Sequence, residues 1–314
     1  MLRVDGHLLA LSEEPLSHEN LLLALRGIMS SEQQTQFSQM HECDFSLDVP
    51  GLSRFRVNVF EQSRGVSAAF RVVPYDTPSL GSLHAPPIFS ELISRARGLV
   101  LVTGSTGSGK STTLAAMVDA LNQAQAKHIV TIEDPIEFVH TPKQCLIQQR
   151  ELGAHTLSFA NALRAALRED PDVILVGELR DLDTIRLAIT AAETGHLVLG
   201  TLHTSSAAKT MDRIVDVFPA QEKEMVRSML SESLNAVISQ VLCKRKDGQG
   251  RVAAFEVMVG TPAVRNLIRE GKVAQLNSAI QTGRGAGMQT LQQSLAMLVQ
   301  QDLIDAHEAQ TTNQ

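Results

Sequence analysis

A glycine-rich segment, GSTGSGKST (residues 104–112), follows the apolar run LVLVT and leads into STTLAAMVDAL. It fits the pattern G-x-x-x-x-G-K-[ST], in which glycines let backbone N–H groups wrap a phosphate at a helix N-terminus. We expect Lys110 to reach the outer phosphates of a nucleotide and the Ser111 hydroxyl to hold magnesium. The predicted binding residues are Ser105, Thr106, Gly107, Ser108, Gly109, Lys110, Ser111 and Thr112.

Two acidic segments follow apolar runs further along the chain. The first, TIEDPIEFVH (131–140), contains Glu133, Asp134 and Glu137 at the end of a predicted strand, where open α/β sheets bind their ligands. Nucleotide hydrolysis needs a carboxylate that orients or deprotonates water near the γ-phosphate, although a solvated acidic loop is the alternative. The second, DPDVILVGE (170–178), has the Walker B arrangement of an apolar strand and an acid, with Glu178 one position later than usual.

Two histidines flank the strand in TGHLVLGTLHT (194–204). His203 follows the strand's carboxyl end, so we predict that it contacts the γ-phosphate. For His196, at the other end, a packed or capping residue is as plausible as a site residue.

These motifs require a sheet that brings strand ends together. Apolar strands at 99–103, 128–132, 172–177 and 196–202 alternate with amphipathic helices at 110–122, 159–168 and 182–193. This alternation predicts an α/β fold around a buried, mostly parallel sheet. Beyond it we expect one helix over 221–240, a hairpin around KDGQGR, and helices near 262–271 and 288–303.

The N-terminal residues 1–74 have the pattern of a small mixed α/β unit. Residues 54–59 and 66–72 alternate apolar and polar side chains, which predicts two strands of a hairpin. Arg54, Arg56 and Arg71 would then share one polar face, which is either functional or simply solvated. Proline and glycine breaks between residues 75 and 87 predict a linker.

Composition excludes several classes of protein. The chain has 314 residues, 43% of them hydrophobic, and a formal net charge of -6, which argues against a nucleic-acid-binding surface. Cys43, Cys145 and Cys243 are widely spaced, so we expect reduced cysteines and no zinc site. The sequence contains no long apolar run and no signal-peptide pattern, so we predict a cytoplasmic protein without a transmembrane segment.

The order of GSTGSGKST, TIEDPIEFVH, REDPDVILVGELRD and TGHLVLGTLHT resembles the secretion-ATPase superfamily, where these positions are Walker A, Asp box, Walker B and His box. SAAKTMDRIVDVFP, EKEMVRSMLSESLNAVISQ and AVRNLIRE (263–270) are similar to its PilT-like branch, which retracts type IV pili. The resemblance spans most of the chain. Val264 stands where isoleucine is typical, and Ser105 replaces a proline of the phosphate loop, which we expect to loosen the turn.

The resemblance implies a hexameric ATPase that uses ATP and Mg²⁺. It implies a PAS-like domain at 1–74 lacking its first segment, a linker at 75–90, a RecA-like ATPase core at 91–260 and a helical C-terminal region at 261–314. By position it assigns the catalytic carboxylate to Glu137, the Walker B acid and magnesium contact to Glu178, and the phosphate contact to His203. Arg54, Arg56 and Arg71 match arginines that the family supplies to the nucleotide.

The implied partners are five further copies of the chain, an inner-membrane pilus platform protein and a paralogous retraction ATPase. The implied activity is ATP-driven pilus retraction during twitching motility, at the cytoplasmic side of the inner membrane. Alternatives are an accessory PilU-like subunit, or a pilus-assembly or type II secretion ATPase, whose zinc module is missing here. The AVRNLIRE helix, with Ala263, Val264, Leu267 and Ile268 on one face, either couples hydrolysis to retraction or only packs in the core.

Overall fold

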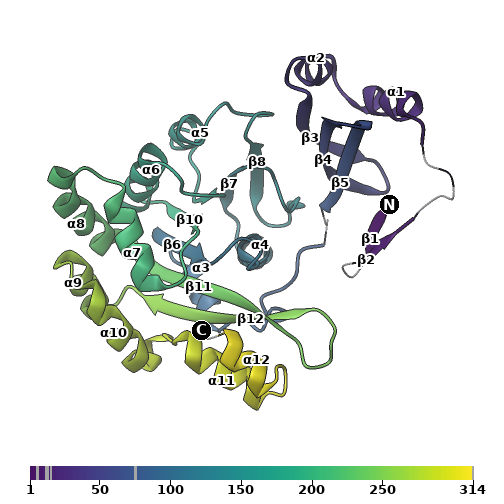
Figure 1. Cartoon of the computed structure of the whole chain (residues 1–314). Coiled ribbons are helices and arrows are strands. Elements are labelled where there is room, and N and C mark those ends of the chain that lie inside the picture. The colour runs from purple at the N-terminus through teal and green to yellow at the C-terminus, as the bar shows by residue number, and fades with distance from the viewer. Residues whose placement is uncertain (5–6, 11–13, 15, 74–75, 313–314) are drawn as a thin grey trace. The chain divides into compact units, whose positions relative to one another are not determined.

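The chain divides into two compact units, Met1–Tyr75 and Asp76–Gln314, each with its own hydrophobic core (Figure 1). The structure, a computed structural model, describes every residue except 5–6, 11–13, 15, 74–75 and 313–314. Tyr75, where the predicted linker starts, therefore lies outside the described residues. Among the described helices, none is long and apolar enough to cross a membrane.

The first unit is an antiparallel sheet of β3, β4 and β5 packed against two helices. Its elements are β1 (Leu2–Val4), β2 (His7–Leu9), α1 (His18–Ile28), α2 (Ser31–Met40), β3 (Glu42–Val49), β4 (Ser53–Gln62) and β5 (Gly65–Val73). Val57 and Val59 of β4 are buried in one cluster with Leu25 and Met29 of the helical layer. Alternation along β4 therefore sends its apolar side chains to the helices and its arginines to the other face.

The second unit is built on a seven-stranded sheet in the order β12-β11-β6-β10-β9-β7-β8. All neighbouring strands are parallel except β12, which is antiparallel to β11. The strands are β6 (Gly98–Thr103), β7 (His128–Glu133), β8 (Leu146–Glu151), β9 (Val173–Val176), β10 (Leu197–Leu202), β11 (Leu234–Lys244) and β12 (Arg251–Val259). Every residue of β6, β9 and β10 is buried, because helices cover both faces of this part of the sheet. This confirms the predicted α/β fold.

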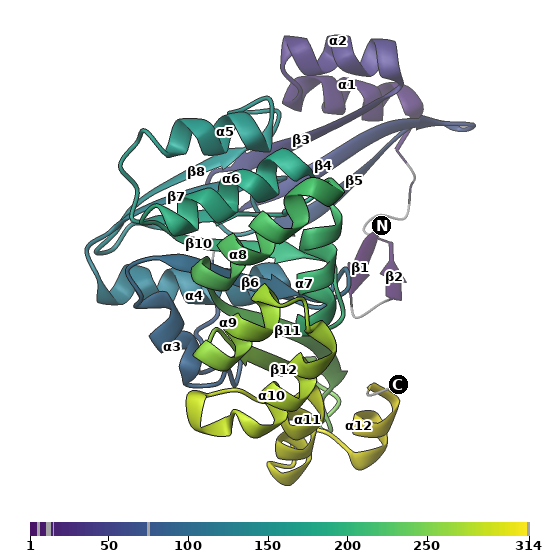
Figure 2. The ribbon, with the colours of Figure 1, turned by 90° about the vertical axis from the view of Figure 1, so that its left-hand side faces the viewer.

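Helices lie on both sides of this sheet, with α3 and α4 on one side and α5, α6 and α8 on the other (Figure 2). The α-helices are α3 (Ile88–Ile93), α4 (Lys110–Ala124), α5 (Phe159–Ala166), α6 (Leu182–Glu193), α7 (Ala207–Asp216), α8 (Lys223–Ser233), α9 (Pro262–Arg269), α10 (Leu276–Thr282), α11 (Leu291–Gln300) and α12 (Ala306–Thr312). The predicted linker, 75–90, overlaps α3, and there Ile88 and Phe89 are buried in the core of the second unit.

The single helix predicted over 221–240 is wrong. Helix α8 ends at Ser233, and β11 begins at Leu234 and runs between β6 and β12. Seven consecutive residues, 234–240, are buried, so the strand shows no apolar–polar alternation that would separate it from a helix. Pairing with strands on both sides decides the structure of this segment.

The AVRNLIRE segment forms most of α9, which begins after the N-cap Thr261. Val264 and Ile268 are buried in the main core and Leu267 is half-buried. Ala263 is exposed, so only three of the four residues predicted to form the apolar face are fully or partly buried. The helix therefore packs firmly along its Val264–Ile268 line.

Candidate nucleotide-binding site

The phosphate loop lies between the end of β6 and the start of α4. Gly104 has φ +147°, and a Cβ there would lie 2.5 Å from the carbonyl oxygen of Gln240, so the position requires glycine. Gly107 has φ +78°, and a Cβ there would meet nothing within 4 Å beyond the adjoining residues, so its side of the loop is open. The loop thus packs closely against β11 and presents an open backbone surface, as a phosphate cradle needs.

The side chain of Lys110 curls back over this loop. Its Nζ donates hydrogen bonds to the carbonyl oxygens of Gly104 and Ser105, each at 3.0 Å. Burial lowers the pKa of Lys110, and the carboxylates of Glu178 and Glu137 partly offset this effect. The structure therefore brings the lysine and both predicted acids within electrostatic reach of one another.

Glu178 follows β9, and its carboxylate lies between the side chains of Arg180 and His203. One of its carboxylate oxygens is 2.8 Å from Arg180 Nη2, and the other is 3.4 Å from His203 Nε2. The Nδ1 atom of His203 is 3.4 Å from the Thr106 hydroxyl of the phosphate loop. His203 consequently bridges the loop and the Walker B acid, at the carboxyl end of β10.

The three acids of the Asp box have different environments. Glu133 accepts hydrogen bonds from the Thr131 hydroxyl at 2.6 Å and from the Gln149 amide at 3.2 Å, and its burial raises its pKa. Asp134 and Glu137 are exposed. Glu133 is thus a structural residue of the turn, whereas Glu137 lies at the surface of the same turn.

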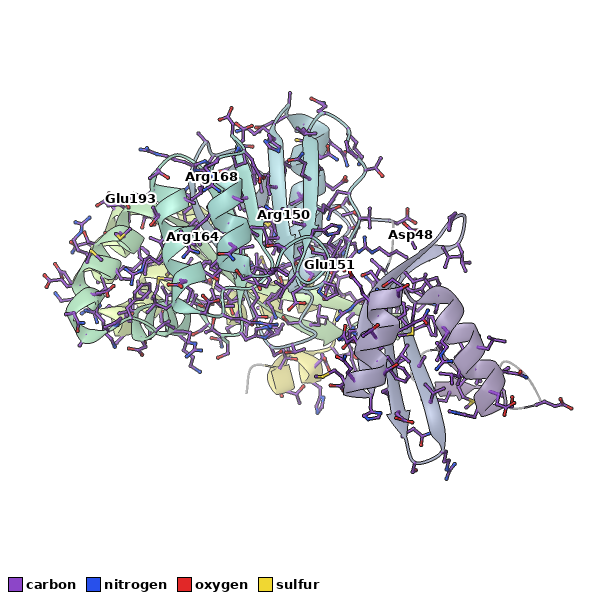
Figure 3. The ribbon with its side chains drawn as sticks, turned by 90° about the horizontal axis from the view of Figure 1, so that it is seen from above. Asp48, Arg150, Glu151, Arg164, Arg168 and Glu193 are labelled. Atoms are coloured by element: carbon purple, nitrogen blue, oxygen red, sulfur yellow. The ribbon has the colours of Figure 1, made fainter. Side chains whose placement is uncertain are left out.

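Strand β8 holds the Asp-box turn from the side. Glu151, at the end of β8 (Figure 3), accepts a hydrogen bond from the backbone N–H of Ile136 at 3.0 Å. Gln149 also donates to the Phe138 carbonyl at 2.9 Å and accepts from the His140 N–H at 2.8 Å. These contacts fix the backbone on both sides of Glu137.

Ser111 and Glu178 suit magnesium by the chemistry of their donor atoms. A serine hydroxyl and a carboxylate are hard oxygen ligands, which Mg²⁺ prefers together with phosphate oxygens and water. Ser111 is the second residue of α4 and half-buried, next to Lys110. The residues present therefore fit a magnesium–nucleotide complex.

Two other groups considered in the sequence belong to other elements. Arg56 pairs directly with Arg71 across β4 and β5, and Arg54 is two residues along the same face, as the alternation predicted. This face belongs to the first unit. His196 precedes β10 at the amino end of the sheet, where its Nδ1 is 3.1 Å from the Ala191 carbonyl, so it caps the end of α6.

Sequence reasoning missed three residues of the site: Arg180, Gln149 and Gln240. Arg180 comes two residues after Glu178, so its position in the sequence was a usable signal. Gln149 and Gln240 lie on strands that the sequence pattern did not predict, β8 and β11. No signal in the sequence placed either glutamine beside the loops it contacts.

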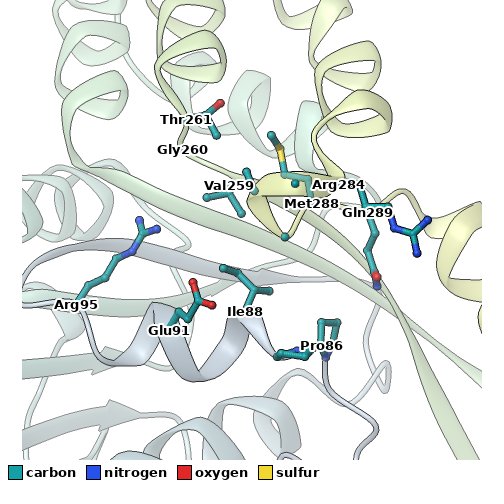
Figure 4. A pocket seen from close by; sticks show the side chains of 14 residues that line it. Pro86, Ile88, Glu91, Arg95, Val259, Gly260, Thr261, Arg284, Met288 and Gln289 are labelled. Carbon is teal, nitrogen blue, oxygen red and sulfur yellow. The ribbon is translucent and has the colours of Figure 1, made fainter.

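A separate pocket of about 520 Å³ opens between α3 and the segments that follow β12 and α10 (Figure 4). Glu91 of α3 and Arg95 just after it line one side, and Arg284 and Met288 line the opposite side. No phosphate-loop residue contributes to its wall. It is therefore a different hollow from the nucleotide site.

Known proteins match this chain along most of its length. Residues 1–310 match the family described as "Type II/IV secretion system protein". The "Type IV pilus retractation ATPase PilT" of Pseudomonas aeruginosa is 60% identical over 309 residues, which cover 98% of this chain and 90% of that protein. The "Twitching motility protein" of Neisseria gonorrhoeae is 60% identical over 304 residues, covering 97% and 81%.

A solved structure, the pilus retraction motor PilT with bound ADP, superposes with a TM-score of 0.91 at 48% sequence identity. The match covers 98% of this chain and 88% of that one. The phosphate loop, the two acids and His203 described above lie within the residues that match the family. The chain therefore belongs to the type II/IV secretion system protein family and is an ATPase.

Proposed function

We propose that this chain is the ATP-hydrolysing motor that retracts type IV pili. The observation that carries the proposal is the 60% identity, over 98% of the chain, to a protein named as a pilus retraction ATPase. A second relative at the same identity is named for twitching motility, the movement that pilus retraction would power. The site geometry supports the hydrolytic half of this proposal.

In the proposed reaction, the phosphate loop and Lys110 bind the β- and γ-phosphates of ATP. Ser111 and Glu178 would hold Mg²⁺, which neutralises phosphate charge when bound. Glu137 orients and deprotonates the attacking water, and the turn contacts from β8 keep its backbone in place. His203 senses the γ-phosphate from its position beside Thr106.

Arg54, Arg56 and Arg71 would supply positive charge to the nucleotide from the first unit. Arginines that stabilise the transition state of phosphoryl transfer are worth about 10³–10⁵ in rate in other NTPases. Because these arginines and the phosphate loop belong to different units, binding and release of nucleotide would move one unit against the other. The segment at 75–90 is the proposed hinge, within a homo-hexamer.

The proposed setting is the cytoplasmic side of the inner membrane. There the ring would act on the pilus platform protein, alone or with a paralogous retraction ATPase. An accessory subunit with little hydrolysis of its own is the second candidate from within the family. The acids Glu137 and Glu178 favour the motor, since an accessory subunit would not need them.

Gene deletion with complementation tests this proposal. We expect cells without the gene to lose twitching and to carry more surface pili, and the native gene to restore both traits. A Glu137→Gln gene should fail to restore them. Bald cells after deletion would overturn the proposal in favour of pilus assembly, and full rescue by Glu137→Gln would indicate an accessory subunit.

A further inference from the structure

The side chain of Gln240 joins β11 to the phosphate loop. It is 1% exposed, its Nε2 donates to the Ser108 carbonyl at 2.6 Å, and its Oε1 accepts from the Thr113 hydroxyl at 2.8 Å. Its own backbone carbonyl occupies the space next to Gly104. Gln240 thus contacts three places: the start of the loop at Gly104, the Ser108 carbonyl within the loop, and the first turn of α4.

The bond to Ser108 sets the direction of one N–H group in the loop. A trans peptide is planar, so the carbonyl of Ser108 and the N–H of Gly109 point in opposite directions. Because Gln240 draws the Ser108 carbonyl towards β11, the Gly109 N–H points away from β11. That is the direction a phosphate-binding N–H needs, since β11 lies on the inner side of the loop.

Strand β11 is a rigid base for this contact. It is hydrogen-bonded to β6 on one side and β12 on the other. At its start, Leu234 O accepts from Arg265 at 3.0 Å, and the Asn235 side chain accepts from Arg95 at 2.9 Å and donates to Arg97 O at 2.8 Å. Gln240 therefore belongs to a strand that is held by its two neighbouring strands. The start of that strand is also held by hydrogen bonds to α9 and to the segment that follows α3.

We propose that Gln240 is a positioning residue of the nucleotide site, which preorganises the Ser108–Gly109 peptide for the phosphates of a nucleoside di- or triphosphate. The proposal rests on the proposed function for the identity of the ligand. An interaction made equally with the bound substrate and with its transition state contributes to affinity and leaves the chemical step unchanged. Loss of Gln240 therefore raises KM and the Kd for ADP without a matching change in kcat.

The test uses the full chain and the variant Gln240→Met, which keeps the volume and removes both hydrogen bonds. We expect ADP to bind about tenfold more weakly, the fold-change that corresponds to the net loss of about one hydrogen bond. KM for ATP should rise by a similar factor, with kcat within about twofold of the native value. Ser239→Ala, at the next buried position on the opposite face of β11, is the matched control and should bind ADP as the native protein does.

A second pair of variants covers the case in which Gln240→Met does not fold. Thr113→Val removes the hydroxyl that donates to Gln240, and Thr113→Ser keeps it. We expect weaker ADP binding in the first and native binding in the second. Native ADP affinity in both Gln240→Met and Thr113→Val, or a fall in kcat at constant KM, would overturn the proposal. A native protein that bound no ADP would instead refute the proposed function.

Discussion

Arg180 forms an ion pair with Glu178, its Nη2 lying 2.8 Å from the carboxylate, and its other terminal nitrogen is 3.7 Å from Asp134. This arginine therefore links the acid that follows β9 with the acid that follows β7. Glu178 is the residue we expect to bind magnesium, so the guanidinium and the metal ion would compete for one carboxylate. The guanidinium of Arg180 thus places a positive charge beside the carboxylate that we propose as a magnesium ligand.

Replacing Arg180 with Gln should lower the Mg²⁺ concentration needed for tight ADP binding. The arginine is more than half exposed, and exposed ion pairs are worth roughly 0.2–1 kcal/mol, which corresponds to a change of about 1.4- to fivefold. A Mg²⁺ titration followed by a fluorescent ADP analogue measures this. Arg180→Lys keeps the charge and serves as the control. A higher Mg²⁺ requirement in Arg180→Gln would show that Arg180 acts on the phosphates instead.

Substitution of Arg56 or Arg71 should lower kcat by about a hundredfold or more, if their charges act on the transferred phosphoryl group. Nucleotide binding, measured with ADP, should change far less, because the charge that they stabilise develops during transfer. The control is Arg64→Ala, an exposed arginine at the turn between β4 and β5. Equal rates in Arg56→Ala, Arg71→Ala and Arg64→Ala would mean that this face is only solvated.

Much of the sheet could be predicted from the sequence because its strands are short, apolar and separated by clear helices. The runs that became β6, β7, β9 and β10 have this form, and the segments that follow these strands carry Lys110, Glu137, Glu178 and His203. Motif spacing therefore predicted which charged and polar residues the ends of these strands bring near one another, and their catalytic roles stay predictions.

The rest could not be predicted because it depends on contacts between distant segments. From its sequence, β11 is predicted to continue the helix α8. The strand is buried on both faces, so its sequence has no alternation of apolar and polar residues that would indicate a strand. Gln240 and Gln149 are uncharged and have no motif, yet tertiary structure places both beside functional loops. The helical pattern predicts that Arg265 and Arg269 of α9 lie together on a polar face. In the structure Arg265 is half-buried and Arg269 is exposed.

That difference between the arginines of α9 yields a prediction about stability. Arg265 donates to the carbonyls of Gly260, Ser231, Glu232 and Leu234, so it satisfies the last carbonyls of α8. Burial lowers its pKa. We expect Arg265→Ala to reduce the free energy of unfolding by roughly 2–4 kcal/mol, since hydrogen bonds to charged groups are worth about 1.5–3 kcal/mol each and several are lost together.

Arg269 is the matched comparison on the same helix. It is exposed and forms an ion pair with Glu232, so Arg269→Ala should cost about 0–1 kcal/mol. Urea unfolding of both variants measures the contrast. If motility falls in Arg269→Ala while stability and ATPase rate stay native, α9 has a coupling role beyond packing. Similar stability losses in the two variants would contradict the capping role of Arg265.

His140, at the end of the Asp-box segment, should make stability depend on pH. Burial lowers its pKa from 6.5 to about 4, so the unfolded chain takes up the proton at a higher pH than the folded chain does. Its contribution is present in full above about pH 6.5 and is lost as the pH falls towards 4. Because the two pKa values differ by this amount, His140 should lower the free energy of unfolding by about 3 kcal/mol over the interval.

Urea unfolding at several pH values between 4 and 7 measures this slope in the native protein and in His140→Leu. The variant has no group to protonate, so its free energy of unfolding should fall less steeply over that interval. His140→Gln, a second uncharged replacement that stays polar, should flatten the slope to the same extent, which separates the titration from any packing effect at neutral pH. Parallel slopes in all three proteins would mean that His140 takes up its proton equally in the folded and unfolded chain, and that other groups carry the acid sensitivity of the fold.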